Sequence, residues 1–214
     1  MRNVRLIYTK TGRMKFVSHL DMNRFFIRLF RIANVPVWYT EGFNKHVYIS
    51  FALPLSLGFE SMYEIADFRI VDDAYTDEML LADLNAHTVD GIKFVDAFEP
   101  VLKAKFAVRS VYRISVKNVS ADILDEFFHR PRIISEKRNK KGEYSEIEIS
   151  HFIEDLLIAS DNDGAVINIT LPSGNDISIN PVLFFSAFEK ETGIICEYHI
   201  VRTAVLDSDK KIFR

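Results

Sequence analysis

Two hydrophobic periods follow one another in the first half of this chain, and their order restricts the folds that it can adopt. Val4–Thr9 alternates apolar and polar residues, as a half-buried strand does. Residues 18–34 instead place apolar side chains, such as Phe26 and Phe30, on one face of a helix. A strand that leads into an amphipathic helix favours an α+β domain.

The same two patterns continue to residue 98. Ser18 and Asp21 predict the start of the first helix, and Pro36 follows its end. A long connection, Gly42–Gly58, leads to the next strand. Further predicted elements are a short return strand at Met14–Val17, strands at Val37–Thr40, Glu64–Val71 and Ile92–Phe98, and a helix at Thr76–His87. The overall order, βαββαβ, is the ferredoxin-like plan.

The second half repeats this plan loosely, so 214 residues suit two domains, residues 1–105 and 106–214. We therefore predict an α+β fold of two ferredoxin-like halves with mainly antiparallel sheets. The second half has an extra hairpin with a basic tip around residues 139–142. The polar tail, Asp207–Arg214, is expected to be loose.

Charge is distributed unevenly between the two ends of the chain. Residues 1–48 hold nine Lys and Arg against two acids, a net charge of +7, although the whole chain is −3. Like charges gathered in one segment indicate a partner of opposite charge. RNA is the first such partner to consider, and an acidic protein surface is the second.

The first helix carries the clearest cationic pattern. Arg24, Arg28 and Arg31 are spaced i, i+4 and i+7, so they share one helical face, and guanidinium groups bind phosphates in bidentate fashion. Arg13 and Lys15 precede the helix and belong to the same basic segment. The alternative is a plain solvated face, with Asp21 as helix cap and ion-pair partner.

The loop at residues 41–51 is the second candidate. It combines Lys45 and His46 with the aromatic residues Phe43 and Tyr48. Exposed aromatic rings beside basic residues stack on unpaired bases. The alternative is a lid in which the aromatic side chains pack back onto the domain. In the second half, Arg109, Arg113 and Lys117 share one strand face and are a weaker phosphate-binding candidate.

Metal and cofactor chemistry receive little support. His19, Asp21 and His46 suit a metal only if distant segments meet, so we predict no metal and no cofactor. The single cysteine, Cys196, lies in an apolar run, which predicts a buried, inert thiol and excludes a disulfide within the chain. No signal peptide or membrane-spanning stretch is visible, so a cytoplasmic location is expected.

Common catalytic motifs are also absent. The sequence holds no Gly-rich phosphate loop, no G-x-G-x-x-G, no G-x-S-x-G and no H-E-x-x-H. Nucleotide hydrolases, dinucleotide enzymes and zinc enzymes are thereby disfavoured.

Several ordered motifs nevertheless resemble one family. They are Tyr8–Gly12, Arg13–Asp21, Glu41–Asn44, and Ile49–Gly58 with Glu60-Ser61. Together they resemble the bacterial radical-SAM-linked proteins, a domain of unknown function, over residues 1 to about 105. The family loop usually reads Gly-Phe-Asn-Pro-His-Pro, and here Lys45 and Val47 replace the two prolines.

The resemblance implies an accessory domain that works beside a radical SAM enzyme and near RNA metabolism. The chain lacks the three-cysteine cluster motif, so radical chemistry would belong to the partner. Three functions stay open: an RNA-binding or substrate-presenting accessory, a protein–protein adaptor without RNA affinity, and an RNA-modifying enzyme laid out like a pseudouridine synthase. Asp21 is the one catalytic candidate for the last.

Overall fold

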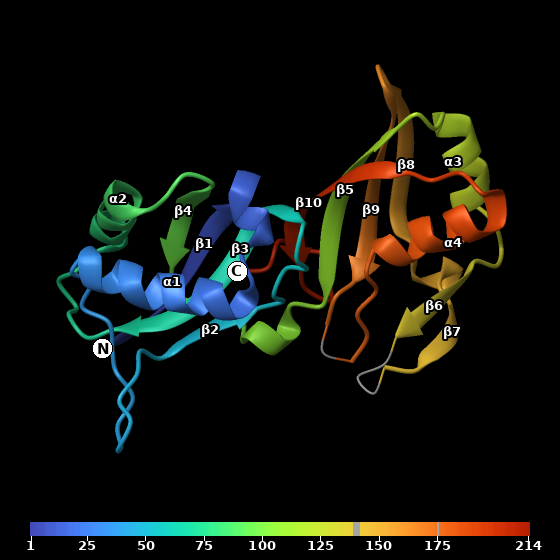
Figure 1. Ribbon diagram of the computed structural model, residues 1–214. Helices are drawn as coiled ribbons and strands as arrows, with labels where there is room; N and C mark the ends of the chain where they lie inside the picture. The colour runs from blue at the N-terminus through green and yellow to red at the C-terminus, as the bar shows by residue number, and fades with distance from the viewer. Residues whose placement is uncertain (139–141, 175) are drawn as a thin grey trace. The chain divides into compact units, whose positions relative to one another are not determined.

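The computed structural model describes residues 1–138, 142–174 and 176–214, and these form a mixed α+β chain with four α-helices and ten strands (Figure 1). The strand pairs within each unit are antiparallel. The chain divides into two compact units: unit 1, Met1–Ala107 with Lys211–Arg214, and unit 2, Val108–Lys210. The tip of the hairpin predicted in the second half, residues 139–141, lies outside the described residues.

Unit 1 places two helices among four strands. In chain order these are β1 (Arg2–Lys10), α1 (His19–Ile32), β2 (Ile49–Ala52), β3 (Glu60–Ile70), α2 (Asp77–His87) and β4 (Ile92–Phe98). β1 lies between β4 and β3, and β2 pairs with the other edge of β3. The elements of this unit follow in the order βαββαβ, with Ile49–Ala52 as the second strand instead of the predicted Val37–Thr40.

The core of unit 1 is aromatic. Phe26 and Phe30 of α1 are fully buried on the sheet, Phe26 at 5.0 Å from the Tyr8 ring and Phe30 at 4.8 Å from the Phe68 ring. Ser18 caps α1 as predicted, because its hydroxyl accepts a hydrogen bond from the Asp21 backbone N–H. This packing fixes which face of α1 points to solvent.

Two predicted strands of unit 1 are wrong. Residues Gly12–Phe16 form a 3₁₀ helix instead of a return strand, since Gly12 adopts a left-handed φ of 57° and Met14 N–H donates back to the Thr11 carbonyl. Val37–Thr40 makes only isolated bridges, Val37 to Ile70 and Tyr39 to Val47. Short segments like these take their conformation from long-range partners that a local pattern does not reveal.

The Tyr39–Val47 bridge creates a narrow β-arm, residues 38–48, that projects from unit 1 (Figure 1). Thr40 N–H donates to the His46 carbonyl at 2.8 Å, and Tyr48 N–H donates to the Trp38 carbonyl at 3.2 Å. The arm then continues into β2, which sequence analysis included in the connection Gly42–Gly58.

The tail of the chain belongs to the core of unit 1, so the expectation of a loose tail is wrong. Phe213 is fully buried beneath the Arg5 guanidinium, whose carbon lies 4.3 Å from the ring centroid. The Phe213 carbonyl accepts a hydrogen bond from the Tyr63 hydroxyl at 2.9 Å. Two adjacent apolar residues in a polar tail, Ile212 and Phe213, gave no periodic signal, but the Phe213 ring is enough to anchor the tail.

Unit 2 has two helices, a four-stranded sheet and a separate hairpin. Its elements are β5 (Arg109–Lys117), α3 (Ala121–Phe128), β6 (Ile134–Arg138), β7 (Tyr144–Glu148), β8 (Glu154–Asp161), β9 (Gly164–Pro172), α4 (Val182–Thr192) and β10 (Glu197–Leu206). The sheet order within the unit is β10-β5-β9-β8, and β6 pairs with β7 alone, as the predicted hairpin. Four buried Phe residues, Phe127, Phe128, Phe184 and Phe188, pack α3 against α4.

Cys196 is expected to resist thiol reagents. It is 7% exposed just before β10, and burial, followed by the Glu189 carboxylate, raises its pKa to about 11. At pH 8 only about one thiol in a thousand is then the reactive thiolate. Labelling by a chromogenic disulfide should be slow in the folded protein and fast in urea. Rapid labelling at pH 8 without urea would contradict a buried thiol.

Candidate nucleic-acid interface

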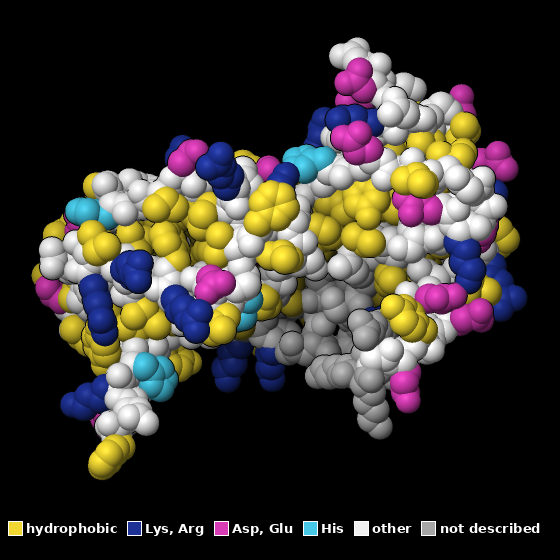
Figure 2. All heavy atoms as spheres, viewed as in Figure 1, with side chains coloured by type: hydrophobic (Ala, Val, Ile, Leu, Met, Phe, Trp, Pro, Cys, Tyr) yellow, Lys and Arg dark blue, Asp and Glu magenta, His cyan; other side chains and the backbone are white. Residues whose placement is uncertain are grey.

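The arginine face of α1 points to solvent. Met22, Phe26, Leu29 and Phe30 bury the opposite face, so the helical spacing leaves Arg24, Arg28 and Arg31 exposed. Figure 2 shows Lys and Arg side chains gathered along α1. Arg24 pairs with Asp21 at 3.0 Å, whereas Arg28 and Arg31 have no acidic partner among the residues that the structure describes. The stripe therefore keeps most of its charge available.

Asp21 is held as a cap and counter-ion. Its carboxylate accepts hydrogen bonds from the Ser18 hydroxyl at 2.7 Å and from Arg24 at 3.0 Å. The Ser18 hydroxyl, followed by the Arg24 guanidinium, lowers the pKa of the Asp21 carboxyl. Its side chain is 54% exposed, and it does not line the cavity described below. These contacts give Asp21 a structural task at the start of α1.

Arg13 and Lys15, the two cations of the 3₁₀ segment, differ in how far acidic groups neutralise them. Lys15 lies 3.6 Å from the Glu60 carboxylate and 5.4 Å from the centroid of the Phe16 ring. Arg13 is exposed, and within the described part of the chain no acidic group pairs with it. Arg13 thus adds to the unneutralised charge, and Lys15 is partly neutralised.

The four candidate residues of the β-arm, Phe43, Lys45, His46 and Tyr48, have different surroundings. His46 Nδ1 lies 3.1 Å from both the Thr40 hydroxyl and the Asn44 carbonyl, which fixes the turn of the arm. Phe43, at the tip, is fully exposed, and Lys45, two residues later, is also exposed. The tip therefore offers an aromatic ring and an ammonium group to a partner.

Tyr48 lies at the base of the arm and is already engaged. Its ring packs against Trp38 with centroids 5.8 Å apart, and the Arg69 guanidinium lies 4.8 Å from its centroid. Tyr48 is nevertheless 41% exposed. The lid that sequence analysis considered as the alternative is thus present at Tyr48, and Phe51 also packs inward on Phe26 at 5.2 Å.

A small cavity lined by both polar and apolar side chains lies at the N-terminal end of α1. Its lining residues are Tyr8, Lys10, His19, Met22, Phe51, Pro54, Leu55 and Glu64, and its volume is about 10 Å³, room for a single water molecule. Lys10 and Glu64 are 3% and 4% exposed. Lys10 Nζ donates a hydrogen bond to the Val17 carbonyl at 2.8 Å. Lys10 comes from β1 and Glu64 from the neighbouring strand β3.

Sequence analysis missed Lys10 and Glu64. The predicted strand ended at Thr9, although β1 runs to Lys10, which lies two residues after Tyr8. Glu64 faces Tyr8 across the β1–β3 ladder. The sequence did carry a signal for this cavity. Three of the motifs that resemble the radical-SAM-linked family contribute side chains to its lining: Tyr8–Gly12, Arg13–Asp21 and Ile49–Gly58.

The histidines predicted as possible metal ligands do not form a cluster. The His19 ring packs edge-on against Phe51 at 5.2 Å, and His46 is bound within the β-arm. In the described ranges, no group of three or more His, Cys, Asp or Glu side chains is arranged to hold a metal. Nor does any described helix combine the length and apolar character that crossing a bilayer requires.

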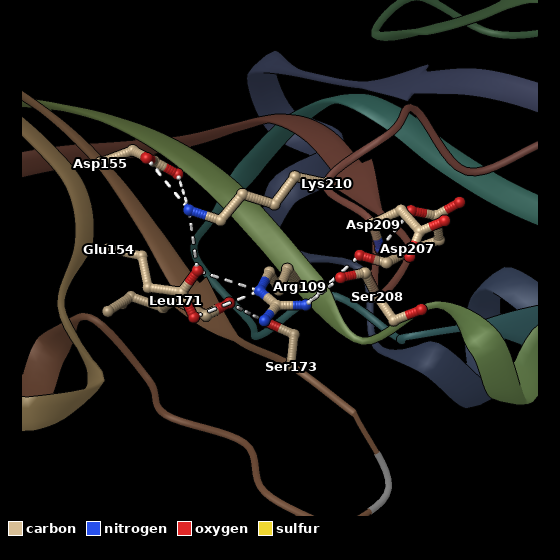
Figure 3. Close-up of polar contacts among 9 residues, drawn as sticks. All are labelled: Arg109, Glu154, Asp155, Leu171, Ser173, Asp207, Ser208, Asp209 and Lys210. Carbon is tan, nitrogen blue, oxygen red and sulfur yellow. Dashed lines mark hydrogen bonds and ion pairs between the residues drawn. The ribbon is translucent and has the colours of Figure 1, made fainter.

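The strand cations of unit 2 are mostly neutralised inside that unit. Arg109 binds the Glu154 carboxylate at 3.0 Å and lies near the carbonyls of Asp207 and Ser208 (Figure 3). Lys117 pairs with Glu197 at 2.7 Å. Arg113 is exposed and is the exception. Unit 1 is therefore the better candidate for binding an external polyanion.

The chain was compared with known proteins. A family model described as an uncharacterised protein conserved in bacteria (DUF2344) matches residues 3–181, which is most of the chain. No curated protein matches it.

Proposed function

We propose that this chain, which belongs to the bacterial family DUF2344, binds RNA through the α1 side of unit 1. One observation supports the proposal most: Arg13, Arg28, Arg31 and Lys45 are exposed and have no acidic partner in the described part of the chain. Exposed ion pairs contribute little to stability, so these cations cost the fold little without one and remain available to an external polyanion.

The arginine stripe would bind the phosphates. Arg24 and Arg31 lie seven residues apart, about 10 Å along the helix axis, and each guanidinium can bind a phosphate with two parallel hydrogen bonds. Phosphate contacts give affinity and position without reading sequence. Base recognition must then come from other groups, and the ring of Phe43 at the arm tip is free to stack on an unpaired base.

We infer in addition that both units follow the ferredoxin-like plan. The support is that unit 1 has the sheet order β4-β1-β3-β2, and that unit 2 has the matching order β10-β5-β9-β8 once the hairpin β6–β7 is left aside. The boundaries proposed from sequence, 1–105 and 106–214, go with this plan, except that Lys211–Arg214 belongs to unit 1.

We further propose a radical SAM enzyme as the protein partner, to which this chain would present its RNA. The resemblance of residues 1 to about 105 is the support for that step. With one cysteine, the chain itself offers no cluster ligand set. Asp21 as a catalytic residue has no additional support, because its contacts are those of a cap.

Salt-dependent RNA binding tests the main proposal. The triple variant Arg24→Ala, Arg28→Ala, Arg31→Ala is expected to reduce the slope of log K against log salt by about 2 for single-stranded RNA, since each lost phosphate contact removes about 0.7. Fluorescence anisotropy with a labelled, unstructured RNA at several salt concentrations measures this slope.

The matched control is Lys117→Ala, which removes an exposed cation that already has an acidic partner in unit 2. This variant should bind RNA as the wild type does. If the wild-type protein shows no RNA affinity at low salt, the proposal fails and the adaptor function becomes the better explanation. If the triple variant shows the same salt dependence as the wild type, RNA does not bind on the arginine face of α1.

A further inference from the structure

We propose that Arg69, held between the rings of Trp38 and Tyr48 at the base of the β-arm, binds a phosphodiester group of RNA. The proposal rests on the RNA binding proposed above and adds a second contact, on a face of unit 1 that does not carry α1. Three observations carry it: two rings fix the guanidinium, its terminal nitrogens have no acidic partner in the described residues, and it lies where the β-arm leaves the sheet.

Arg69 lies on the face of the unit 1 sheet opposite to α1. Phe68 and Ile70, its neighbours on β3, are buried in the core, where the Phe30 ring of α1 lies 4.8 Å from the Phe68 ring. Successive side chains of a strand point to opposite faces, so Arg69 points away from α1. Asn3, its partner across the β1–β3 ladder, is exposed on the same face. An external ligand can therefore reach this part of the sheet.

Two aromatic rings fix the guanidinium of Arg69. Its carbon lies 5.0 Å from the centroid of the Trp38 ring and 4.8 Å from that of the Tyr48 ring, and the two ring centroids are 5.8 Å apart. The Trp38 N–H also donates to the Arg69 carbonyl at 2.9 Å, which joins the start of the β-arm to β3. A free arginine side chain loses rotamer freedom when it binds a ligand, whereas one that is already held loses less. The rings thus prepare the guanidinium for a ligand.

The terminal nitrogens of Arg69 lack an acidic partner among the residues that the structure describes. Nε donates to the Asn3 side-chain oxygen at 3.2 Å. Asp67, two residues earlier on β3, instead binds Arg5, at 2.8 and 2.7 Å. A guanidinium carries five N–H donors, of which the contact with Asn3 uses one. The two terminal nitrogens can therefore donate in parallel to the oxygens of one phosphate.

The site lies within reach of the arginine stripe and of the β-arm. Trp38 follows Arg31 by seven residues, so the two lie no more than about 25 Å apart even for a fully extended chain. The β-arm, which begins at Trp38, projects from unit 1 (Figure 1) and carries the exposed Phe43 ring. A single strand of several nucleotides can therefore contact the stripe, Arg69 and the β-arm together.

The aromatic surroundings favour a nucleic-acid phosphate over a carboxylate of a protein partner. The Tyr48 ring is 41% exposed beside the guanidinium of Arg69. In a single-stranded nucleic acid, bases with a π-face accompany the phosphates, and such bases stack on exposed aromatic rings and on arginine. An aspartate or glutamate side chain would bind the guanidinium and leave the ring exposed. A phosphodiester group with its neighbouring base would contact both.

The variant Arg69→Gln tests this site in the titration with labelled, unstructured RNA described above. It is expected to weaken binding about 10-fold, because charge-assisted hydrogen bonds are lost. It should also reduce the slope of log K against log salt by about 0.7, the share of one phosphate. Lys93→Gln is the matched control, because it removes an exposed positive charge from β4, two strands away from Arg69 in the same sheet. This control should bind RNA as the wild type does.

Tyr48→Leu distinguishes a phosphate contact from mere support of the β-arm. This variant loosens the guanidinium of Arg69 but keeps its charge. Affinity for RNA should therefore fall only about 3-fold, the share of one cation–π contact, and the salt slope should stay that of the wild type. If Arg69→Gln acted only by loosening the β-arm, it too would leave the slope unchanged.

The fluorescence of Trp38 reports on the same site, since it is the single tryptophan of the chain and its ring lies against Arg69. Unlabelled RNA should change this emission with the affinity that anisotropy gives, which keeps the test valid if Arg69→Gln fails to fold. An unchanged salt slope in a folded Arg69→Gln, or an unchanged Trp38 emission, would overturn the site and leave the proposed function standing. No RNA affinity in the wild type would remove the proposed function and this site together.

Discussion

Replacement of Asp67 by Ala is expected to lower the free energy of unfolding of unit 1 by about 3 kcal/mol. The Asp67 carboxylate accepts two hydrogen bonds from Arg5, from Nε at 2.8 Å and from Nη2 at 2.7 Å. The Arg5 side chain is fully buried, so removal of Asp67 leaves a charge without compensation. The Asp67 side chain is 19% exposed, so we expect a loss of stability at the low end of the range for broken buried ion pairs.

Urea unfolding followed by tryptophan fluorescence measures this change. Trp38 is the single tryptophan of the chain and lies in unit 1, so its signal reports on that unit. Asp67→Asn keeps an acceptor and should lose less stability than Asp67→Ala. The double variant Arg5→Met, Asp67→Leu replaces the pair by apolar side chains and should recover most of the loss. A double variant as unstable as Asp67→Ala would show that the buried charge is not the cause.

Phe213→Ala is expected to destabilise unit 1 by about 3–5 kcal/mol, the usual loss when a buried Phe is truncated. The ring is fully buried and lies against the Arg5 guanidinium at 4.3 Å. Its removal opens a cavity and also takes the cation–π contact from a buried charge. The midpoint of urea unfolding, again read from Trp38, should fall well below that of the wild type.

The neighbouring residue supplies the control for this prediction. Ile212 is 50% exposed, so Ile212→Ala should change the free energy of unfolding by no more than about 0.5 kcal/mol. Equal effects of the two substitutions would mean that the tail acts as a whole and not through one anchored ring. If Phe213→Ala has only a small effect on the free energy of unfolding, the tail is loosely held, as its polarity suggests.

Local signals predicted local structure well. The Ser18 cap and the spacing of Phe26 and Phe30 identified α1 and its buried face, and the strand Ile92–Phe98 has the predicted bounds. Both depend on residues near in sequence. The error at Met14–Val17 has the same cause, because alternation over four residues does not distinguish a strand from the 3₁₀ turn that Gly12 permits.

The sequence alone could predict the part of the candidate interface that lies on a single helix. Arg24, Arg28 and Arg31 share a face because of helix geometry alone, so sequence sufficed to align them. The engagement of Tyr48 by Arg69 depends on β3, and the placement of Lys10 and Glu64 in the lining of one cavity depends on strand register. Contacts between residues of different elements, far apart in sequence, leave no periodic trace in a single sequence.

The position of Phe213 also bears on how the protein is made. Unit 1 needs a residue that is synthesised after the whole of unit 2. On the ribosome, we expect the first hundred residues to reach their full stability only after Phe213 has been synthesised, because the Arg5 side chain is uncovered until then. All residues of unit 2 are synthesised before Phe213, so unit 2 can complete its fold before unit 1 does.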